Sequence, residues 1–198
     1  MKTFNEAFAD INAEYDAEIN EPEKPKDLVE RFKTSDGGTF DIVHDSDPLN
    51  PRTEFDNITK MICFHRRYNL GDKHDYKTSD FNGWDELEER LLEDFGSGSV
   101  IKPLFMLDHS GLRLSTSSFN DHWDSGQVGF VLVPEKNLGD VPDPDAAIEA
   151  EVQVYDDFLS GAVYGFIKYG KDGEQTASGF GFYGEDGIRA IKDENGIG

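Results

Sequence analysis

Residues 100–116 read Val-Ile-Lys-Pro-Leu-Phe-Met-Leu-Asp-His-Ser-Gly-Leu-Arg-Leu-Ser-Thr, and this stretch decides the fold class. Two apolar runs, 100–107 and 112–116, flank a four-residue turn whose last residue is glycine. A parallel crossover needs about a dozen residues, so strands joined by this turn must be antiparallel. Residues 162–169 and 176–183, joined around Gly-Lys-Asp-Gly, repeat the pattern as a closing hairpin. The sequence therefore predicts an antiparallel sheet.

Further elements extend outward from these hairpins. Apolar runs predict strands over 39–43, 61–67 and 128–133. Apolar residues three or four apart predict two helices, one over 84–95 and one that begins at an Asp145 cap and ends before Gly161. The predicted fold class is therefore α+β, an antiparallel β-sheet with two or three helices packed on it.

The chain is predicted to fold as a single α+β domain over 39–184, with segments of other character at each end. Residues 1–20 carry one apolar helical face and predict an N-terminal amphipathic helical arm. Prolines at 22 and 25 predict a linker over 21–38, and the acidic, glycine-rich residues 185–198 predict a fraying tail.

The 198 residues carry a formal net charge of −22, and the excess is spread along the whole length. A negative field of this kind repels nucleic acid and anionic membranes and attracts basic proteins and cations. The lone Cys63 excludes an internal disulfide, and no apolar run has the length of a membrane span. We expect no direct binding of nucleic acid or membrane, and a cytoplasmic setting. Oligomeric state stays open.

Five short segments together resemble a family of uncharacterised proteins encoded by bacteriophages and prophages. They are Cys-Phe-His-Arg-Arg-Tyr-Asn-Leu-Gly-Asp-Lys-His (63–74), Leu-Asp-His-Ser-Gly (107–111), Trp-Asp-Ser-Gly-Gln-Val-Gly-Phe (123–130), Val-Tyr-Gly-Phe (163–166) and Gly-Phe-Tyr-Gly (181–184). The resemblance runs from about residue 41 to residue 184 and implies a viral origin and the host cytoplasm, but no reaction. Relatives often have Cys-Pro where this chain has Asp121-His122, so a cysteine-based role does not transfer.

These segments also hold the residues best suited to binding or catalysis. Arginine side chains grip phosphate or carboxylate groups bidentately, and histidine–carboxylate pairs supply proton relays or metal ligands. The binding candidates are His65, Arg66, Arg67, Trp123 and Gln127, and the candidates for a catalytic role are His65, His74, Asp108, His109 and Asp124. The alternative is that the cations neutralise nearby acids and that the His/Asp pairs are polar turn residues.

A loop over 45–57 clusters oxygen donors that a hard divalent cation would accept. Its candidate ligands are Asp45, Asp47, Asn50 and Asp56, although their spacing is not that of an EF-hand. The alternative is an ordinary turn, because Asp and Asn side chains bond to their own backbone. We therefore expect no obligatory cofactor and keep a divalent cation as a possibility.

Three functions are compatible with these observations. The first is an acidic binding protein that inhibits or modulates a basic, nucleic-acid-handling host or defence protein by mimicking DNA, as anti-restriction and anti-CRISPR proteins do. The second is a small metal-dependent hydrolase, which requires three central segments, 63–74, 107–111 and 123–130, to meet in space. The third is a structural or accessory phage protein without an inhibitory role. We place binding before catalysis.

Overall fold

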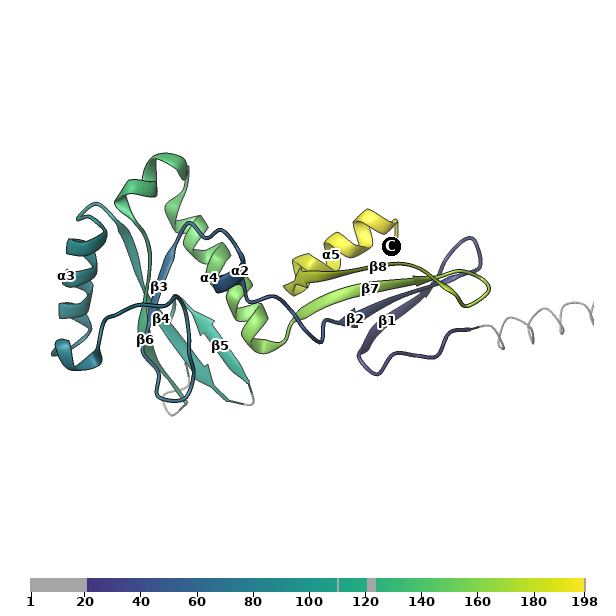
Figure 1. The fold of residues 1–198 in the computed structure, drawn as a ribbon, viewed down its shortest axis with the longest axis horizontal. Helices are drawn as coiled ribbons and strands as arrows, with labels where there is room; N and C mark the ends of the chain where they lie inside the picture. Colours follow the sequence, from purple (N-terminus) through teal and green to yellow (C-terminus); the bar gives the residue numbers. More distant parts are fainter. Residues whose placement is uncertain (1–20, 110, 121–123, 198) are drawn as a thin grey trace, which may run out of the picture. The chain divides into compact units, whose positions relative to one another are not determined.

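The computed structural model describes residues 21–109, 111–120 and 124–197, and these form two compact units. Among these residues, unit 1 combines 21–48 with 161–197, and unit 2 lies within 49–160 (Figure 1). Both contain antiparallel strands and helices, which confirms the α+β class. The single domain expected over 39–184 is thus divided, because unit 2 is inserted between two strands of unit 1. The predicted N-terminal arm, 1–20, lies outside the described residues.

Unit 1 is a four-stranded antiparallel sheet covered on one face by a helix. Its strands are β1 (Leu28–Lys33), β2 (Thr39–His44), β7 (Val163–Tyr169) and β8 (Gln175–Tyr183), in the order β1-β2-β7-β8, and its helix is α5 (Gly184–Asn195). Ile191 of α5 is fully buried against Phe40 and Ile42 of β2. The unit therefore has its own hydrophobic core.

Two sequence expectations for unit 1 are corrected by this arrangement. The linker expected over 21–38 contains β1. Its charged residues obscure the apolar pattern that would predict a strand, because Arg31 packs into the sheet by binding the fully buried carboxylate of Asp41 at 2.6 Å. The tail expected over 185–198 contains most of α5, because Ile188 and Ile191 give it an apolar face that packs on the sheet.

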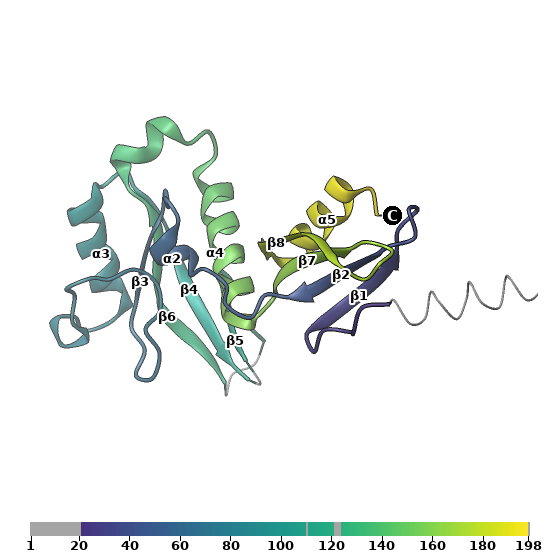
Figure 2. The ribbon, with the colours of Figure 1, turned by 45° about the vertical axis from the view of Figure 1, so that its right-hand side comes forward.

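Unit 2 is a second four-stranded antiparallel sheet with a long helix on each face (Figures 1 and 2). Its elements are α2 (Pro51–Glu54), β3 (Lys60–Cys63), α3 (Trp84–Phe95), β4 (Val100–Asp108), β5 (Leu112–Ser115), β6 (Ser125–Val133) and α4 (Pro144–Ser160), with short 3-10 helices at Thr78–Asp80 and Glu135–Asp140. The strand order is β3-β6-β4-β5. Alternate residues face opposite helices: Met61 packs in the cluster with α4, and Ile62 in the cluster with α3.

Most predicted elements of unit 2 are present, with two changes. The strand expected over 61–67 ends at Cys63, and the chain leaves the sheet as a loop. Asp143, rather than Asp145, caps α4, because its Oδ1 accepts from the backbone N–H of Ala146 at 3.0 Å. Pro144 then occupies the first helical position, where a missing N–H costs nothing.

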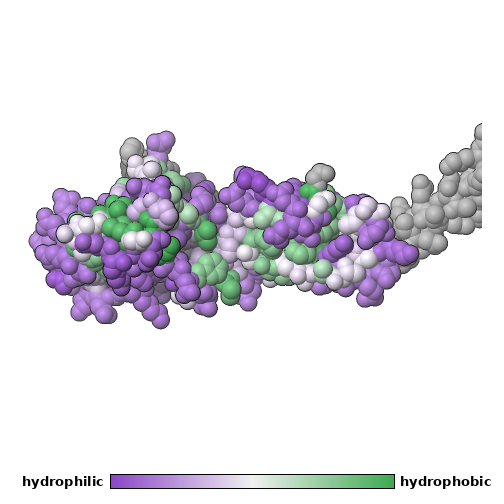
Figure 3. All heavy atoms as spheres, turned by 90° about the horizontal axis from the view of Figure 1, so that it is seen from above, coloured by the Kyte–Doolittle hydropathy of each residue, from purple (hydrophilic) through white to green (hydrophobic). Residues whose placement is uncertain are grey.

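Hydrophilic residues cover most of the surface visible in Figure 3, with smaller apolar patches on each unit. Within the described part of the chain, no helix has both the length and the apolarity that crossing a membrane requires.

Candidate functional site

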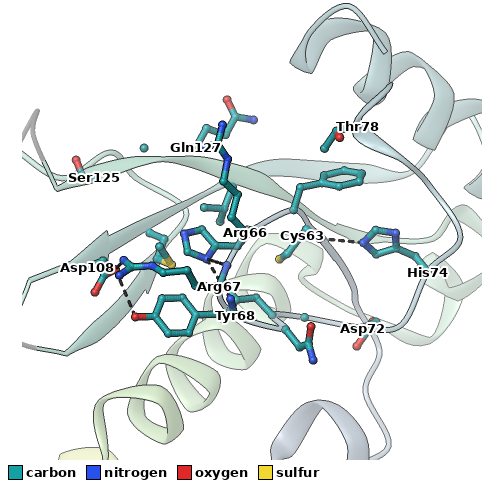
Figure 4. Close-up of a pocket in the computed structure, with 18 of the residues that line it drawn as sticks. Cys63, Arg66, Arg67, Tyr68, Asp72, His74, Thr78, Asp108, Ser125 and Gln127 are labelled. Atoms are coloured by element: carbon teal, nitrogen blue, oxygen red, sulfur yellow. Dashed lines mark hydrogen bonds and ion pairs between the residues drawn. The ribbon is translucent and has the colours of Figure 1, made fainter. Parts of the chain in front are cut away.

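The three central segments meet at one cleft of unit 2, with a volume of about 1520 Å³ (Figure 4). Their convergence follows from the strand order. β6 lies antiparallel between β3 and β4, so the end of β3, the start of β6 and the end of β4 lie at the same end of the sheet. The lining includes 63–74, Asp108 and 124–128, together with Thr78, Trp84 and Met106.

The first wall of the cleft is a closed loop, 64–70, that leaves β3 and returns to it. Gly71 forms an isolated bridge with Ile62, and the N–H of Asp72 donates to the carbonyl of Met61 at 2.8 Å. Gly71 has a φ of +67°, and a Cβ at this position would lie 2.6 Å from the Met61 carbonyl oxygen. Its N–H donates to the hydroxyl of the buried Tyr155 at 3.1 Å. Both ends of the loop are therefore fixed to the core.

Within the loop, His65 organises the backbone. Its Nδ1 accepts from the N–H groups of Arg67 and Tyr68, both at 3.3 Å, and its ring stacks on that of Tyr68 at 4.9 Å. In the neutral ring an accepting Nδ1 places the proton on Nε2. Arg67 pairs with Asp108, and the Tyr68 hydroxyl donates to the same carboxylate at 3.4 Å. The loop is thus tied to the end of β4.

In the cleft, the acidic side chains have partners of opposite charge or histidine partners, whereas two of the basic side chains have none among the described residues. Its three acids all have cationic or histidine partners: Asp72 binds Arg52, Asp108 binds Arg67, and Asp124 lies 3.0 Å from Nδ1 of His109. Of the cations that line the cleft, Arg66 and Lys73 form no ion pair with any residue that the structure describes. The cleft therefore presents unpaired positive charge in a strongly acidic chain.

In Figure 4, the Arg66 side chain extends toward Gln127 at the start of β6. Arg66 is exposed, whereas Gln127 is half-buried and donates through Nε2 to the Gly129 carbonyl at 3.2 Å. The loop and β6 thus place a guanidinium and a side-chain amide on one wall.

Behind the cleft lies a buried polar network centred on Arg52. Its guanidinium binds both oxygens of Asp72, at 3.0 and 2.9 Å, and Glu151 of α4 at 2.8 Å. It also donates to the Thr59 carbonyl at 3.0 Å and to Asn57 Oδ1 at 3.1 Å. Burial opposes its charge, but the hydrogen bonds and charges of Asp72 and Glu151 outweigh burial and raise the pKa of Arg52.

Cys63 and His74 both line the cleft and are joined by a hydrogen bond. Burial raises the pKa of the Cys63 thiol to about 12, so the group is not a nucleophile near neutral pH. Nε2 of His74 donates to the Cys63 carbonyl at 2.9 Å. His74 Nδ1 is buried and has no hydrogen-bond partner among the described residues.

The structure brings most of the candidate residues together. Of the hydrolase candidates, His65, His74, Asp108 and Asp124 line the cleft, and His109 lies beside Asp124. Among the described residues, no group of three His, Cys, Asp or Glu side chains is arranged to hold a metal ion. The hydrolase stays a prediction. Of the binding candidates, His65, Arg66, Arg67 and Gln127 line the cleft, while Trp123 lies outside the described residues.

Two of the four candidate cation ligands form hydrogen bonds with backbone N–H groups through their side chains. Asp45 accepts from the N–H of Asp47 at 3.0 Å and from Gly181 N–H at 3.1 Å. Asn50 caps α2 by accepting from Arg52 N–H at 2.9 Å, and Asp56 lines a smaller surface cavity. For Asp45 and Asn50, the structure has the turn and cap bonds that were the alternative to metal binding.

Several cleft residues were not among the sequence candidates. Tyr68, Asp72 and Lys73 all lie within 63–74, where the candidates were the neighbouring histidines and arginines. Trp84 enters from α3, outside the segments quoted above, and no local pattern in the sequence links it to the cleft.

Comparison of the chain with protein-family models, with curated proteins and with solved structures finds no match.

Proposed function

We propose that unit 2 is a binding module that holds an anionic group, phosphate or carboxylate, in the cleft formed by 64–70 and the start of β6. The observation that carries the proposal is the unpaired charge of Arg66 and Lys73 in a cleft whose acids all have partners. In a chain of net charge −22, an unpaired guanidinium in a recess is an attractive position for an anion.

The geometry around Arg66 supports such a ligand. A guanidinium offers parallel N–H donors that match the oxygens of phosphate and carboxylate. The loop that carries Arg66 is closed at Gly71 and anchored through His65 and Asp108, so little ordering is needed when a ligand binds. Because Nδ1 of His65 accepts, its ring adds a second donor at Nε2.

An NMR titration with inorganic phosphate, and separately with citrate, tests the proposal. We expect chemical-shift changes at residues 63–74 and 124–128 and at the Arg66 side chain. Arg66→Ala removes a charge-assisted contact and is expected to weaken binding about tenfold or more. The matched control is Arg189→Ala, which removes an exposed arginine of α5 and should leave the titration unchanged.

Shifts that follow exposed lysines and arginines across both units would contradict the proposal, as would an Arg66→Ala variant that titrates like the wild type. Phosphate alone or citrate alone at the cleft would identify which anion the site prefers.

The second candidate is the acidic inhibitor of a basic, nucleic-acid-handling host or defence protein, acting in a host cytoplasm. The observation that favours it is α3, which carries six acids and one base in 12 residues. Several of these acids are exposed, including Glu89 and Glu93. The resemblance to phage-encoded proteins supports the same candidate.

Its test is capture of a basic partner on the immobilised protein at low salt. Duplex DNA and high salt should release the partner, and replacing Glu89 and Glu93 with Gln should weaken capture, whereas replacing Asp193 and Glu194 of unit 1 with amides should not. A partner that DNA does not displace would exclude mimicry.

A further inference from the structure

The outer edge of β8 in unit 1 is an open strand edge. β8 is the last strand of its sheet and pairs only with β7 among the described residues. Its nine residues, Gln-Thr-Ala-Ser-Gly-Phe-Gly-Phe-Tyr, include no charge and no proline, and the first four are exposed. Unprotected edges of this kind are templates for pairing with another chain.

The other three sheet edges are protected. β1 carries three charged residues, Glu30, Arg31 and Lys33, and a bulge. β3 is covered by the Gly71–Asp72 return of the cleft loop. On β5 the N–H of Leu114 donates to the buried carboxylate of Asp156 at 2.7 Å. Among the residues that the structure describes, β8 is thus the one edge strand without such protection.

Backbone groups of β8 are directed outward at its centre. The carbonyl of Ala162 accepts from Gly184 N–H at 2.8 Å, so even-numbered residues of β7 turn their backbone groups toward β8. Ser178 and Phe180 pair with odd-numbered residues of β7. Their N–H and C=O groups therefore point to the outer edge, where an added strand would bond to them.

Side chains around this edge indicate what would bind. The ring of Phe180 is 51% exposed and lies over Gly165, so a neighbouring strand would cover it. Glu174 and Glu185 bracket the strand, and neither forms an ion pair with the described residues. In an antiparallel pairing of two copies these glutamates would oppose each other and repel. Lys or Arg at both ends of a foreign strand would instead complement them.

We propose that the outer edge of β8 binds an extended segment of a partner polypeptide as a fifth antiparallel strand. The segment has an uncharged, β-branched centre, which pairs with the backbone around Ser178 and Phe180, and basic residues at both ends, which meet Glu174 and Glu185. Backbone hydrogen bonds supply the affinity in this mode of recognition, and the flanking charges supply the selectivity.

A labelled peptide, Lys-Lys-Thr-Val-Thr-Val-Thr-Lys-Lys, titrated with the full chain and followed by fluorescence anisotropy, tests the proposal. Ser178→Lys places a charge at the centre of the edge and should weaken binding about tenfold or more. The control Gln153→Lys adds the same charge on α4 and should have no effect. Arg66→Ala should also have no effect, because the cleft lies in the other unit.

A second form of the peptide leaves the protein unchanged. Methylation of the peptide nitrogens on its pairing side removes the hydrogen bonds to β8 while keeping the charge, and should weaken binding about tenfold or more. Equal binding of the methylated peptide would overturn the proposal and indicate attraction by charge alone. Absence of binding at about 1 mM protein would also overturn it. So would a wild-type dimer, seen by sedimentation, that Ser178→Lys dissociates, because the edge would then serve a second copy.

Discussion

Replacing Arg52 with alanine is expected to destabilise unit 2 severely, because this side chain joins three separate parts of the unit. It connects the start of the unit, the return of the cleft loop at Asp72 and the helix α4 at Glu151. The Arg52 side chain is 1% exposed, so alanine would leave two carboxylates facing a largely buried space without their cation.

The magnitude follows from this burial. Breaking a buried ion pair by removing one partner costs about 3–5 kcal/mol. The carboxylates of Asp72 and Glu151 are 12% and 20% exposed and keep other donors, the N–H groups of Met61 and Ile58. They therefore recover part of their solvation, and we expect a loss of about 3–4 kcal/mol.

Urea unfolding followed by tryptophan fluorescence measures this loss in unit 2 alone. Both tryptophans of the chain, Trp84 and Trp123, belong to the sequence of unit 2. With a urea dependence of about 1.5–2 kcal/mol per molar, the midpoint should fall by about 2 M. Arg52→Lys should recover only part of this loss, because an ammonium cannot bind Asp72 through two parallel N–H groups.

The matched control is Arg31→Ala, which removes a bidentate arginine from Asp41 in unit 1. It should leave the tryptophan transition in place. A shift below about 0.5 M for Arg52→Ala would refute the assignment of Arg52 as the centre of the unit. An equal shift for Arg31→Ala would refute the independence of the tryptophan signal.

Three further predictions concern the residues around the cleft. Gly71→Ala should cost about 2–4 kcal/mol in the tryptophan-monitored transition, from the positive φ and the clash with the Met61 carbonyl, whereas Gly139→Ala, with open space around its Cβ, should be tolerated. Cys63 should resist iodoacetamide at pH 8 in the folded protein and react in urea; equal rates would contradict its burial. Above its ordinary pKa of 9.0, the unfolded thiol releases its proton, while the folded thiol keeps it to about pH 12. The Cys63 contribution to stability is thus fully present below about pH 9 and is lost as pH rises toward 12. Cys63→Ala should flatten this alkaline decline in urea midpoints measured from pH 8 to 11.

Local patterns predicted the elements that depend on local chemistry. The hairpin of β4 and β5 follows from its short turn, and the face of α4 formed by Ile148, Val152 and Tyr155 follows from helical spacing. The strand predicted over 61–67 from an apolar run was wrong beyond Cys63, because Gly71 brings the chain back to the edge of β3. A return of this kind depends on contacts that sequence periodicity does not record.

Distant pairings set the rest of the site. Arg52 and Asp72 are 20 residues apart, and Arg52 and Glu151 are 99 apart, so no window along the chain could pair them. Arg66 and Arg67 show the same limit on a smaller scale. They are adjacent, but Arg67 is neutralised by Asp108 and Arg66 has no acidic partner among the described residues. The sequence alone does not distinguish the two arginines, because the acid that pairs with Arg67 is brought next to it by the order of strands in the sheet.

The insertion of unit 2 between β2 and β7 also sets an order of events during synthesis. The hairpin of β1 and β2 leaves the ribosome first, but a two-stranded hairpin alone is marginal in water. Its sheet partners follow only after the roughly 110 residues of unit 2 have been made, about 6–22 s later at elongation rates of about 5–20 residues per second.

Unit 2 is formed by one continuous stretch of the chain and is expected to fold during that interval. Strands β1 and β2 of unit 1 meanwhile lack the strands and helix that bury their apolar side chains. Unit 1 then closes when β7, β8 and α5 emerge, and its last strand is the uncharged β8. The strand whose edge is least protected is therefore made last, which shortens the time in which the unfinished sheet can pair with a neighbouring nascent chain.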